Sequence, residues 1–391
     1  MITGENIVCI SSHYWHEPWF RKQHFMSRFA KENRVLYVEP SFSMARRPPK
    51  RVGGDIATNR FFKAHVETVS DNLFLLKPPR GLPKWSYPTI SKVNYIWFAK
   101  IIDKAAKRLD MSYYILWVYR PEYFPALKYF NYKKLVFDLT DDLAVYGGKK
   151  DNSYRHKTKC INNLIEKSNL VVVTAKTLFK RYQNSASGKI FHIPNGVDLE
   201  LFSKPNKEVP LDLRNIKRPI IGFVGVLFNL IDYDLITYLA DKNKDYSVVL
   251  VGPIEPWGTK ESIEKLKKRK NIYLLGKKNK EKIPSYVSQF DVCINPFKVD
   301  QVSRSVNPLK VYEYLACGKP VVSVKMKALK EEEVGKMIDF ASDYKDFGDK
   351  IEFWLANDSQ NKKRDRINMV VDYSWENLFL ELKEACSILE K

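Results

Sequence analysis

The sequence predicts an α/β protein of two domains, each built on a parallel sheet. The chain has 391 residues, which is more than one hydrophobic core usually serves. Short runs of β-branched and other apolar residues, such as 170–173 and 248–251, are typical of strands that are buried on both faces. Helical patterns separate these runs along most of the chain, and this alternation is typical of parallel sheets.

The first strand is predicted over 7–10, and a polar, aromatic loop over 11–19 follows it. In a doubly wound sheet, the loops at the carboxyl ends of the strands form the ligand site. His13 is therefore a candidate catalytic residue in a loop that could bind an acceptor. The aromatic rings of the loop could equally seal the domain. A helix over 23–30 and a strand over 35–38 complete a βαβ unit.

His13 and His16 lie close together, but no Asp, Glu or Cys completes a recognisable metal-ligand spacing with them. No metal is therefore expected. The five cysteines are odd in number and contain no Cys-x-x-Cys pair, which favours buried, reduced thiols.

Residues 41–100 interrupt the regular pattern, and regular structure is not expected there; possible membrane-facing segments fall within 41–108. Cations alternate with aromatic residues and prolines over 46–63 and 77–87, and 95–109 is predicted as an amphipathic helix with a basic side. Such segments suit contact with an anionic membrane, and we expect the two loops to reach it before the helix. The alternative is an ordinary helix packed on the sheet with its basic face in water.

The positive charge is concentrated in the first half of the chain. Residues 1–204 hold 34 Lys and Arg against 17 Asp and Glu, whereas residues 205–391 hold 32 against 28. This asymmetry indicates an anionic partner such as membrane lipid, a lipid-linked or acidic glycan, or nucleic acid. A merely lysine-rich, soluble surface is the alternative. A cytoplasmic protein is expected, since neither a membrane-spanning run nor a signal-peptide layout appears.

A group of carboxylates, Asp138, Asp141 and Asp142, follows a strand predicted over 135–137. Asp141 or Asp142 could accept or orient the proton of an acceptor hydroxyl, and crowding of like charges should raise at least one pKa. Capping of the next helix would explain the same residues without catalysis. Both interpretations remain open at this point.

One stretch of the second half predicts a helix that starts at Asn307 and Pro308 and stops at Gly318. Asn307, the helix N-terminus and Lys310 together form an anion site. Glu313, one turn further on, could accept hydrogen bonds from a ribose diol, so the pair suits a nucleoside diphosphate. The alternative is a surface ion pair between residues three positions apart.

The segment 310–322, Lys-Val-Tyr-Glu-Tyr-Leu-Ala-Cys-Gly-Lys-Pro-Val-Val, resembles the donor-site signature of GT-B glycosyltransferases, particularly of family 4 and its teichuronic-acid-type relatives. Residues 194–198 resemble a second element of that family. The resemblance implies two facing Rossmann-like domains, with an acceptor bound by the first and a nucleotide sugar bound by the second. In that family the diphosphate and the ribose are held by the positions of Lys310 and Glu313, without a metal or another cofactor.

The resemblance also implies further donor-site residues. Gly225 would let the backbone approach a phosphate, and Gly276 lies where the family binds the base. Asn229 stands in a loop where the family usually has cations, and Arg304 is expected to supply the missing charge. Ser305 replaces a glutamate that many members use, so the contact to the donor sugar stays unassigned.

The domain boundaries follow from the same comparison. The first domain is expected to span 1–204, a linker 205–217, and the donor domain 218–372. An amphipathic helix over 373–391 is expected to cross back and pack on the first domain.

The predicted function is transfer of a hexosyl group from a UDP- or GDP-sugar to a glycan or lipid-linked glycan in cell-surface polysaccharide synthesis, at the inner face of the membrane. Retention of configuration is typical of family 4; in an inverting enzyme, Asp141 or Asp142 would be the base. A GT-B-fold sugar-nucleotide epimerase is an alternative that would need no basic, membrane-facing domain. A basic nucleic-acid-binding protein is a second alternative, although no recognition motif appears.

Overall fold

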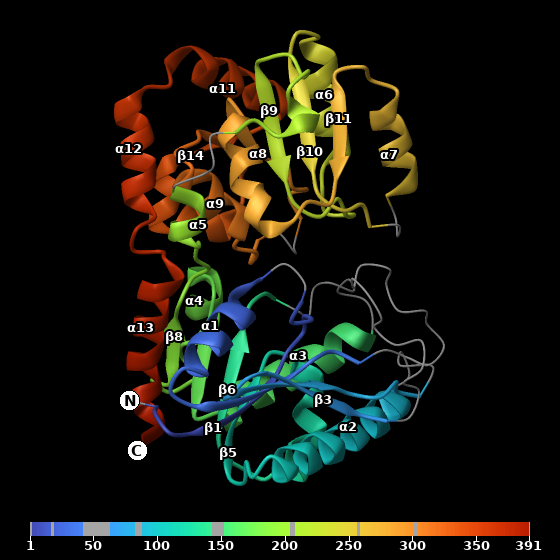
Figure 1. The fold of residues 1–391 in the computed structure, drawn as a ribbon, viewed down its shortest axis with the longest axis vertical. Coiled ribbons are helices and arrows are strands. Elements are labelled where there is room, and N and C mark those ends of the chain that lie inside the picture. Colours follow the sequence, from blue (N-terminus) through green and yellow to red (C-terminus); the bar gives the residue numbers. More distant parts are fainter. Residues whose placement is uncertain are drawn as a thin grey trace. The chain divides into compact units, whose positions relative to one another are not determined.

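The computed structural model describes residues 2–16, 19–41, 63–82, 88–142, 152–203, 208–255, 259–300 and 304–390. The chain forms two compact units (Figure 1). Unit 1 comprises Met1–Thr174, Leu178–Ile193 and Phe379–Lys391, and unit 2 comprises Ala175–Thr177 and Pro194–Leu378. Most of the two predicted membrane-contacting loops, 46–62 and 83–87, lies outside the described residues.

Unit 1 is built on a sheet in the order β3-β4-β2-β1-β5-β6-β7-β8. Every pairing between neighbours is parallel except that of β3 with β4, which is antiparallel at the edge. The strands are β1 (Asn6–Ile10), β2 (Arg34–Val38), β3 (His65–Ser70), β4 (Leu73–Lys77), β5 (Tyr114–Val118), β6 (Tyr132–Leu139), β7 (Leu170–Val173) and β8 (Ile190–His192).

The helices of this part of the chain are α1 (Arg21–Phe29), α2 (Pro88–Arg108), η1 (Pro121–Tyr129), α3 (Asn152–Lys167) and α4 (Lys176–Tyr182). Strands β5 and β7 are buried along their whole length, as expected of parallel strands covered on both faces. The chain order reverses between β1 and β5, so ligand-binding loops are expected at the carboxyl ends of these strands.

Unit 2 contains a wholly parallel sheet in the order β11-β10-β9-β12-β13-β14, which is the strand order of a dinucleotide-binding Rossmann domain. Its strands are β9 (Ile220–Val224), β10 (Ser247–Val251), β11 (Ile272–Gly276), β12 (Val292–Asn295), β13 (Val321–Val324) and β14 (Ile338–Ala341). Its helices are α5 (Leu199–Ser203), η3 (Leu211–Leu213), α6 (Tyr233–Lys242), α7 (Lys260–Lys267), η4 (Lys280–Lys282), α8 (Ile283–Gln289), α9 (Leu309–Ala316), α10 (Lys327–Glu331), η5 (Glu333–Met337), α11 (Tyr344–Asn357) and α12 (Gln360–Met369).

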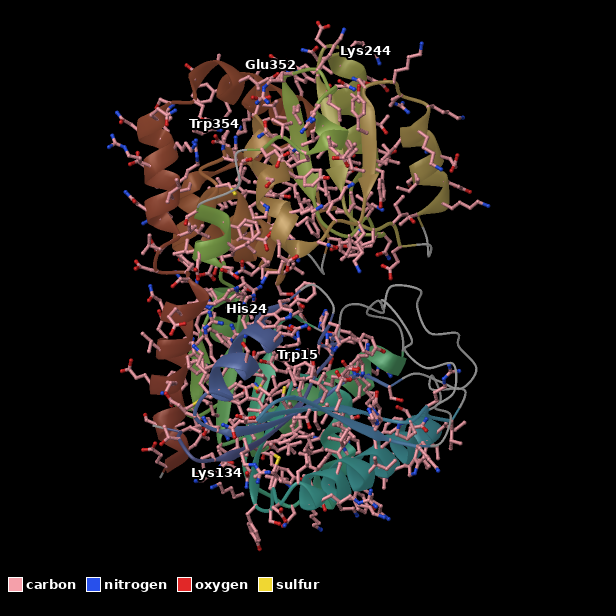
Figure 2. All side chains as sticks on the ribbon, viewed as in Figure 1. Trp15, His24, Lys134, Lys244, Glu352 and Trp354 are labelled. Carbon is pink, nitrogen blue, oxygen red and sulfur yellow. The ribbon has the colours of Figure 1, made fainter. Side chains whose placement is uncertain are left out.

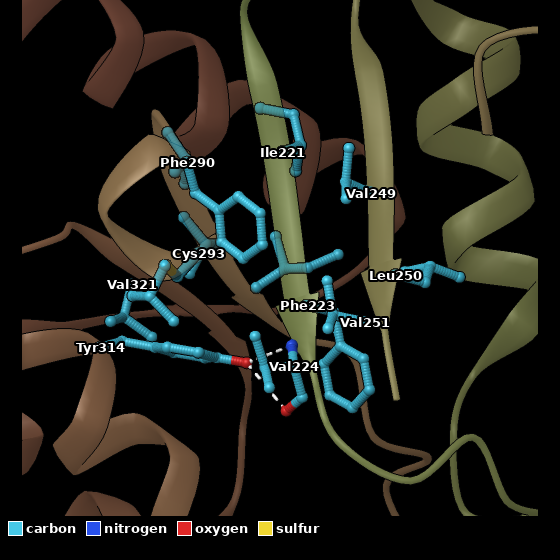
Figure 3. Close-up of a cluster of buried hydrophobic side chains, with 14 of the residues drawn as sticks. Ile221, Phe223, Val224, Val249, Leu250, Val251, Phe290, Cys293, Tyr314 and Val321 are labelled. Atoms are coloured by element: carbon cyan, nitrogen blue, oxygen red, sulfur yellow. Dashed lines mark hydrogen bonds between the residues drawn. The ribbon is translucent and has the colours of Figure 1, made fainter. Parts of the chain in front are cut away.

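The core of unit 2 joins β9 to the helices on either side of it (Figure 3). A side chain at Gly222 would collide with the ring of Phe290, so the glycine lets α8 pack directly on the strand. The hydroxyl of Tyr314 accepts a hydrogen bond from Val224 N at 2.7 Å and donates one to Val224 O at 3.2 Å. These contacts hold α9 at the carboxyl end of β9.

The final helices are α13 (Trp375–Ala385) and η6 (Cys386–Glu390). Helix α13 begins in unit 2 and belongs to unit 1 from Phe379 onward. The ring centroid of Phe379 lies 4.8 Å from that of Phe29 on α1, and Lys383 Nζ lies 2.6 Å from a carboxylate oxygen of Glu32. The end of the chain is therefore part of the first unit.

The five cysteines all lie in the described residues and are buried free thiols, which confirms the expectation from their spacing. Across the described parts of the chain, no helix combines the length and the apolar character needed to cross a bilayer.

Candidate functional site

The candidate donor site lies at the carboxyl edge of the sheet in unit 2. The strand order reverses between β9 and β12, which places the loops after these two strands next to each other. Gly225 and Asn229 belong to the loop after β9, while Arg304 and Asn307 belong to the connection from β12 to α9. The sheet order thus brings together candidates that are some 80 positions apart in the sequence.

Helix α9 starts at Leu309, one position later than the sequence predicted for its first residue. Pro308 is the N-cap, with an extended backbone at ψ 115°, and Asn307 lies before it. Asn307 therefore lies before the cap, and its backbone oxygen accepts a hydrogen bond from Asn195 Nδ2 at 2.7 Å. The predicted stop is confirmed, since Gly318 takes a φ of +70° just after the helix.

Lys310 and Glu313 form an ion pair, with 2.7 Å between Lys310 Nζ and Glu313 Oε2. The Glu313 side chain is only 7% exposed and that of Lys310 is 29% exposed, so this is not the open surface pair that the sequence allowed as an alternative. Burial raises the pKa of Glu313, and the charge of Lys310 opposes that rise. A buried carboxylate held by one lysine at a helix N-terminus is well suited to a ligand that carries both an anion and hydroxyl groups.

Lys280, which sequence reasoning missed, and Asp198, from the segment 194–198, extend this cluster. Lys280 lies after β11 and approaches Asp198, with 3.4 Å between Lys280 Nζ and Asp198 Oδ2. Lys280 lowers and Asp198 raises the pKa of Glu313, so both charges act at the same carboxylate. A lysine four positions after Gly276, at the end of a predicted strand, was the available signal for this cation.

The glycines of the site have different roles. A Cβ at Gly225 would meet the ring of Phe223. A Cβ at Gly252 would meet the carbonyl of Gly225, so the backbones of Gly225 and Gly252 approach each other closely. Gly276 takes a φ of +69°, and a Cβ there would have no atom within 4 Å. Open space beside Gly276 is compatible with its predicted place next to a base.

Asn229 and Arg304 are both exposed. Within the described residues, Arg304 makes no ion pair, so its guanidinium is available to an anion. Ser305 beside it is buried, and the adjacent residues 301–303 lie outside the described set. Arg304 therefore remains a candidate cation of the donor site, although the structure shows no contact between it and α9.

In unit 1, His13 lies in the loop after β1 and is held by its backbone. Tyr37 donates a hydrogen bond from its hydroxyl to His13 O at 2.9 Å, and Ser12 Oγ lies 3.0 Å from His13 Nδ1. Burial and the charge of Lys22 lower the pKa of His13 well below its usual value. The imidazole is therefore neutral at pH 7, and one of its ring nitrogens can accept a proton.

The aromatic residues of the same loop pack inward. Trp15 is buried and lies edge-on to Tyr37, with 5.0 Å between ring centroids. Trp15 and His24, both labelled in Figure 2, each lie 5.3 Å from the ring of Trp19. These contacts favour the interpretation that the rings seal the domain.

Lys22 is the main residue of unit 1 that sequence reasoning missed. It lies in the first turn of α1, is 4% exposed, and forms no ion pair or hydrogen bond with another described residue. Its Nζ lies 4.9 Å from the centroid of the Tyr119 ring. Burial lowers the pKa of Lys22, while Asp141 and Asp138 raise it. The adjacent Arg21 instead pairs with Asp138, with 3.1 Å between Arg21 Nε and Asp138 Oδ1.

The two candidate carboxylates of unit 1 have different environments. Asp142 is held by Arg181, with 2.6 Å between Asp142 Oδ2 and Arg181 Nη1, which gives it a structural partner. Burial raises the pKa of Asp141 to about 7, although the charge of Lys22 opposes the rise. Asp141 is therefore the better candidate for proton transfer near neutral pH.

The candidates thus form two groups, His13, Asp141 and Lys22 in unit 1 and the donor-site residues in unit 2. Among the described residues, no group of three or more His, Cys, Asp or Glu side chains is arranged to hold a metal ion.

Comparison with known proteins finds similarity to glycosyl transferases. Residues 211–369 match the family of group 1 glycosyl transferases. The chain is 24% identical, over 68% of its length and 70% of the relative, to a putative teichuronic acid biosynthesis glycosyltransferase, TuaH, of Bacillus subtilis.

Solved structures show the same fold over nearly the whole chain. Sucrose-phosphate synthase from Thermosynechococcus elongatus matches with a TM-score of 0.74 at 16% identity, covering 99% of each chain. Anabaena HepE, in complex with UDP and glucose, matches with a TM-score of 0.64 at 14% identity, covering 98% of this chain and 99% of that one. A structure described as trehalose-6-phosphate from Escherichia coli, with bound UDP-2-fluoro glucose, matches with a TM-score of 0.71 at 11% identity. The match covers 97% of this chain and 98% of that one.

The fold is therefore GT-B, and over residues 211–369 the chain is similar to glycosyl transferases of group 1. The resemblance recognised in residues 310–322 is confirmed. The teichuronic acid relative is the kind of enzyme that this resemblance pointed to.

Proposed function

We propose that this enzyme transfers a hexosyl group, with retention of configuration, from a UDP- or GDP-sugar to a hydroxyl of a glycan or lipid-linked glycan in cell-surface polysaccharide synthesis. The similarity to a putative teichuronic acid glycosyltransferase supports the polysaccharide acceptor. Two structures of the same fold contain UDP or a UDP-sugar, which favours UDP as the donor nucleotide.

The observation that carries the proposal is the ion pair of Lys310 with the buried Glu313 in the first turns of α9, with Lys280 acting on the same carboxylate. A diphosphate at this end of the helix would draw the ammonium of Lys310 toward itself. Glu313 would then be released to accept hydrogen bonds from the ribose hydroxyls. The two side chains are therefore already in position, and a nucleoside diphosphate would bind by separating them.

Charge stabilisation follows from the same residues. As the bond from the sugar to the diphosphate breaks, negative charge grows on the departing phosphate. Lys310, the first-turn N–H groups of α9 and Arg304 would stabilise that charge. A retaining transfer by this route makes no base obligatory, and the proposal requires neither a metal nor another cofactor.

The donor site is tested by thermal shift with UDP and GDP on Lys310→Met and Glu313→Gln. Removing either group is expected to weaken nucleotide binding at least about tenfold, because a charge-assisted hydrogen bond contributes about 1.5–3 kcal/mol. Glu264 and Lys267 on α7 provide a matched control, since they form an exposed pair with the same spacing at 2.8 Å. Lys267→Met and Glu264→Gln should leave the shift unchanged. Unchanged affinity in both donor-site variants would refute the assignment.

Product analysis distinguishes transfer from epimerisation. A transferase releases the nucleotide only as sugar appears on an added acceptor. Conversion of the sugar nucleotide alone into an isomer, without acceptor, would identify an epimerase instead.

We also propose that the enzyme acts at the inner face of the membrane, attracted by the basic first half of the chain. Vesicles rich in anionic lipid should co-sediment the protein at low salt. Changing Arg46, Arg47, Lys50 and Arg51 to Ser should reduce the bound fraction severalfold. Absence of co-sedimentation at low salt would contradict the membrane location while leaving the donor site untouched.

A further inference from the structure

A hollow of about 500 Å³ lies in unit 1 and is lined by residues of the edge strand β3 and of the C-terminal half of α2. In the part of the chain that the structure describes, β3 pairs with β4 at the edge of the sheet, and the start of β3 contributes to the lining of the hollow. The lining residues come from the start of β3 and the two residues before it, from β4, and from the last two turns of α2 with Leu109 after them. None of the candidate site residues contributes to it.

The floor of the hollow is apolar. Leu76 of β4 and Ala105 of α2 are buried, and Ile101 and Leu109 are partly exposed beside them. A floor of this kind can bind hydrocarbon, because removing apolar surface from water lowers the free energy in proportion to the area covered.

Cations surround the floor. Lys63, Lys104 and Arg108 line the hollow and are exposed. None of the three makes an ion pair with a described residue, although their neighbours do: Lys107 Nζ lies 2.8 Å from Asp103, and Lys77 is bound to Glu67. No acidic side chain is among the described residues that line the hollow. The hollow therefore has an uncompensated positive rim.

We propose that this β3–α2 groove binds one anionic phospholipid. The phosphate would lie among Lys63, Lys104 and Arg108, and the first carbons of the acyl chains would cover Ile101 and Leu109. A free phosphate or a nucleic acid would use the cations but leave the apolar floor uncovered, and a neutral lipid would use the floor but leave the cations unpaired. An anionic lipid satisfies both, and the charge excess of the first half of the chain favours it.

This inference rests on the proposed membrane location and is independent of the sugar-transfer reaction. It goes further in that it assigns a stoichiometric lipid site to particular residues. It predicts saturable binding of one lipid per chain, which a diffuse basic surface would not show.

The test uses soluble, short-chain dihexanoyl phosphatidylglycerol, with binding to the full chain measured by calorimetry. Dihexanoyl phosphatidylcholine and glycerol 3-phosphate are the comparison probes; the first lacks the net charge and the second lacks the chains. One-to-one binding of phosphatidylglycerol is expected, at least about tenfold tighter than either comparison probe. Equal binding of glycerol 3-phosphate would reduce the groove to a phosphate site and overturn the lipid assignment.

Charge-matched variants separate the groove from general attraction. Lys63→Gln, Lys104→Gln and Arg108→Gln together should weaken phosphatidylglycerol binding more than tenfold, at about fivefold per cation. Lys92→Gln, Lys100→Gln and Lys107→Gln remove the same amount of charge from parts of α2 outside the groove, and should change binding less than twofold. Equal loss in both triple variants would overturn the proposal in favour of a diffuse basic surface.

A third variant tests the floor. Ile101→Gln should weaken phosphatidylglycerol binding severalfold without changing the response to glycerol 3-phosphate. All variants should keep the wild-type thermal shift with UDP, which verifies folding and reports on the proposed donor site separately. Loss of the UDP response in the wild type would contradict the proposed function, whereas an intact UDP response without lipid binding would contradict the groove alone.

Discussion

At the scale of single residues, the neighbouring carboxylates Asp141 and Asp142 of unit 1 differ because their surroundings differ. Asp142 is paired with Arg181, whereas burial raises the pKa of Asp141 to about 7 against the opposing charge of Lys22. Their order in the chain predicted that like charges would raise one pKa, but not which one. The partners lie far away in the sequence, on α4 and α1.

Asp141→Asn should stabilise the fold above neutral pH. The pKa of Asp141 is higher in the folded chain than the usual value near 3.8, so stability from this group is present at low pH and is lost as the pH rises toward 7. We expect the Tm of the variant to exceed that of the wild type by a few degrees at pH 8, and to equal it near pH 4. Differential scanning fluorimetry across this range measures the difference.

Asp142→Asn is the paired control, since it breaks the contact with Arg181 and should lower the Tm at pH 8. A Tm for Asp141→Asn that stays below the wild type at every pH would show that its carboxylate is not destabilised by burial. The same variant also tests stereochemistry: a retaining transferase should keep most of its activity, whereas an inverting one should lose it.

At the scale of elements, α9 and its surroundings give the donor site its geometry. The start region at Asn307, the Lys310–Glu313 spacing and the stop at Gly318 follow from local rules, and only the first helical residue moved by one position. Local rules did not predict that the Tyr314 hydroxyl forms hydrogen bonds with both backbone groups of Val224. These bonds connect α9 to β9.

Tyr314→Phe should therefore destabilise unit 2 by about 1–3 kcal/mol, because it leaves buried backbone groups of Val224 without their partner. Urea unfolding followed by far-UV circular dichroism measures the change. Tyr344→Phe is a suitable comparison, since that hydroxyl binds Asp232 at the exposed end of α6 and should cost under about 1 kcal/mol. Equal costs for the two variants would show that the Tyr314 contacts do not fasten α9.

At the scale of the whole molecule, the end of the chain completes the first unit. Phe379 packs beside Phe25 and Phe29 of α1, and it is separated from them by most of the sequence. The predicted amphipathic helix over 373–391 agrees with α13 and η6. The compact units, however, change at Pro194 and again within α13, after Leu378.

Phe379→Ala should destabilise the protein by about 3 kcal/mol, as expected for removal of a buried aromatic ring. Leu380→Ala at the neighbouring, 58% exposed position should cost under about 0.5 kcal/mol. Chemical unfolding monitored by tryptophan fluorescence measures both. A loss no greater than that of Leu380→Ala would mean that the terminal helix contributes little to unit 1.

Local patterns of the chain were enough to predict most of the alternation of strands and helices, the parallel pairing in both sheets, and the Lys310–Glu313 pair. They did not predict the antiparallel strands β3 and β4, which lie where no regular structure was expected. Apolar runs, glycines and prolines act on nearby backbone, and helix periodicity brings together residues three positions apart. Lys280 beside Asp198, Lys22 near Asp141, and the cationic groove between β3 and α2 emerged only from the folded chain. Each depends on which strands become neighbours in a sheet, and sheet order is set by packing between segments that are distant in sequence rather than by the residues within one segment.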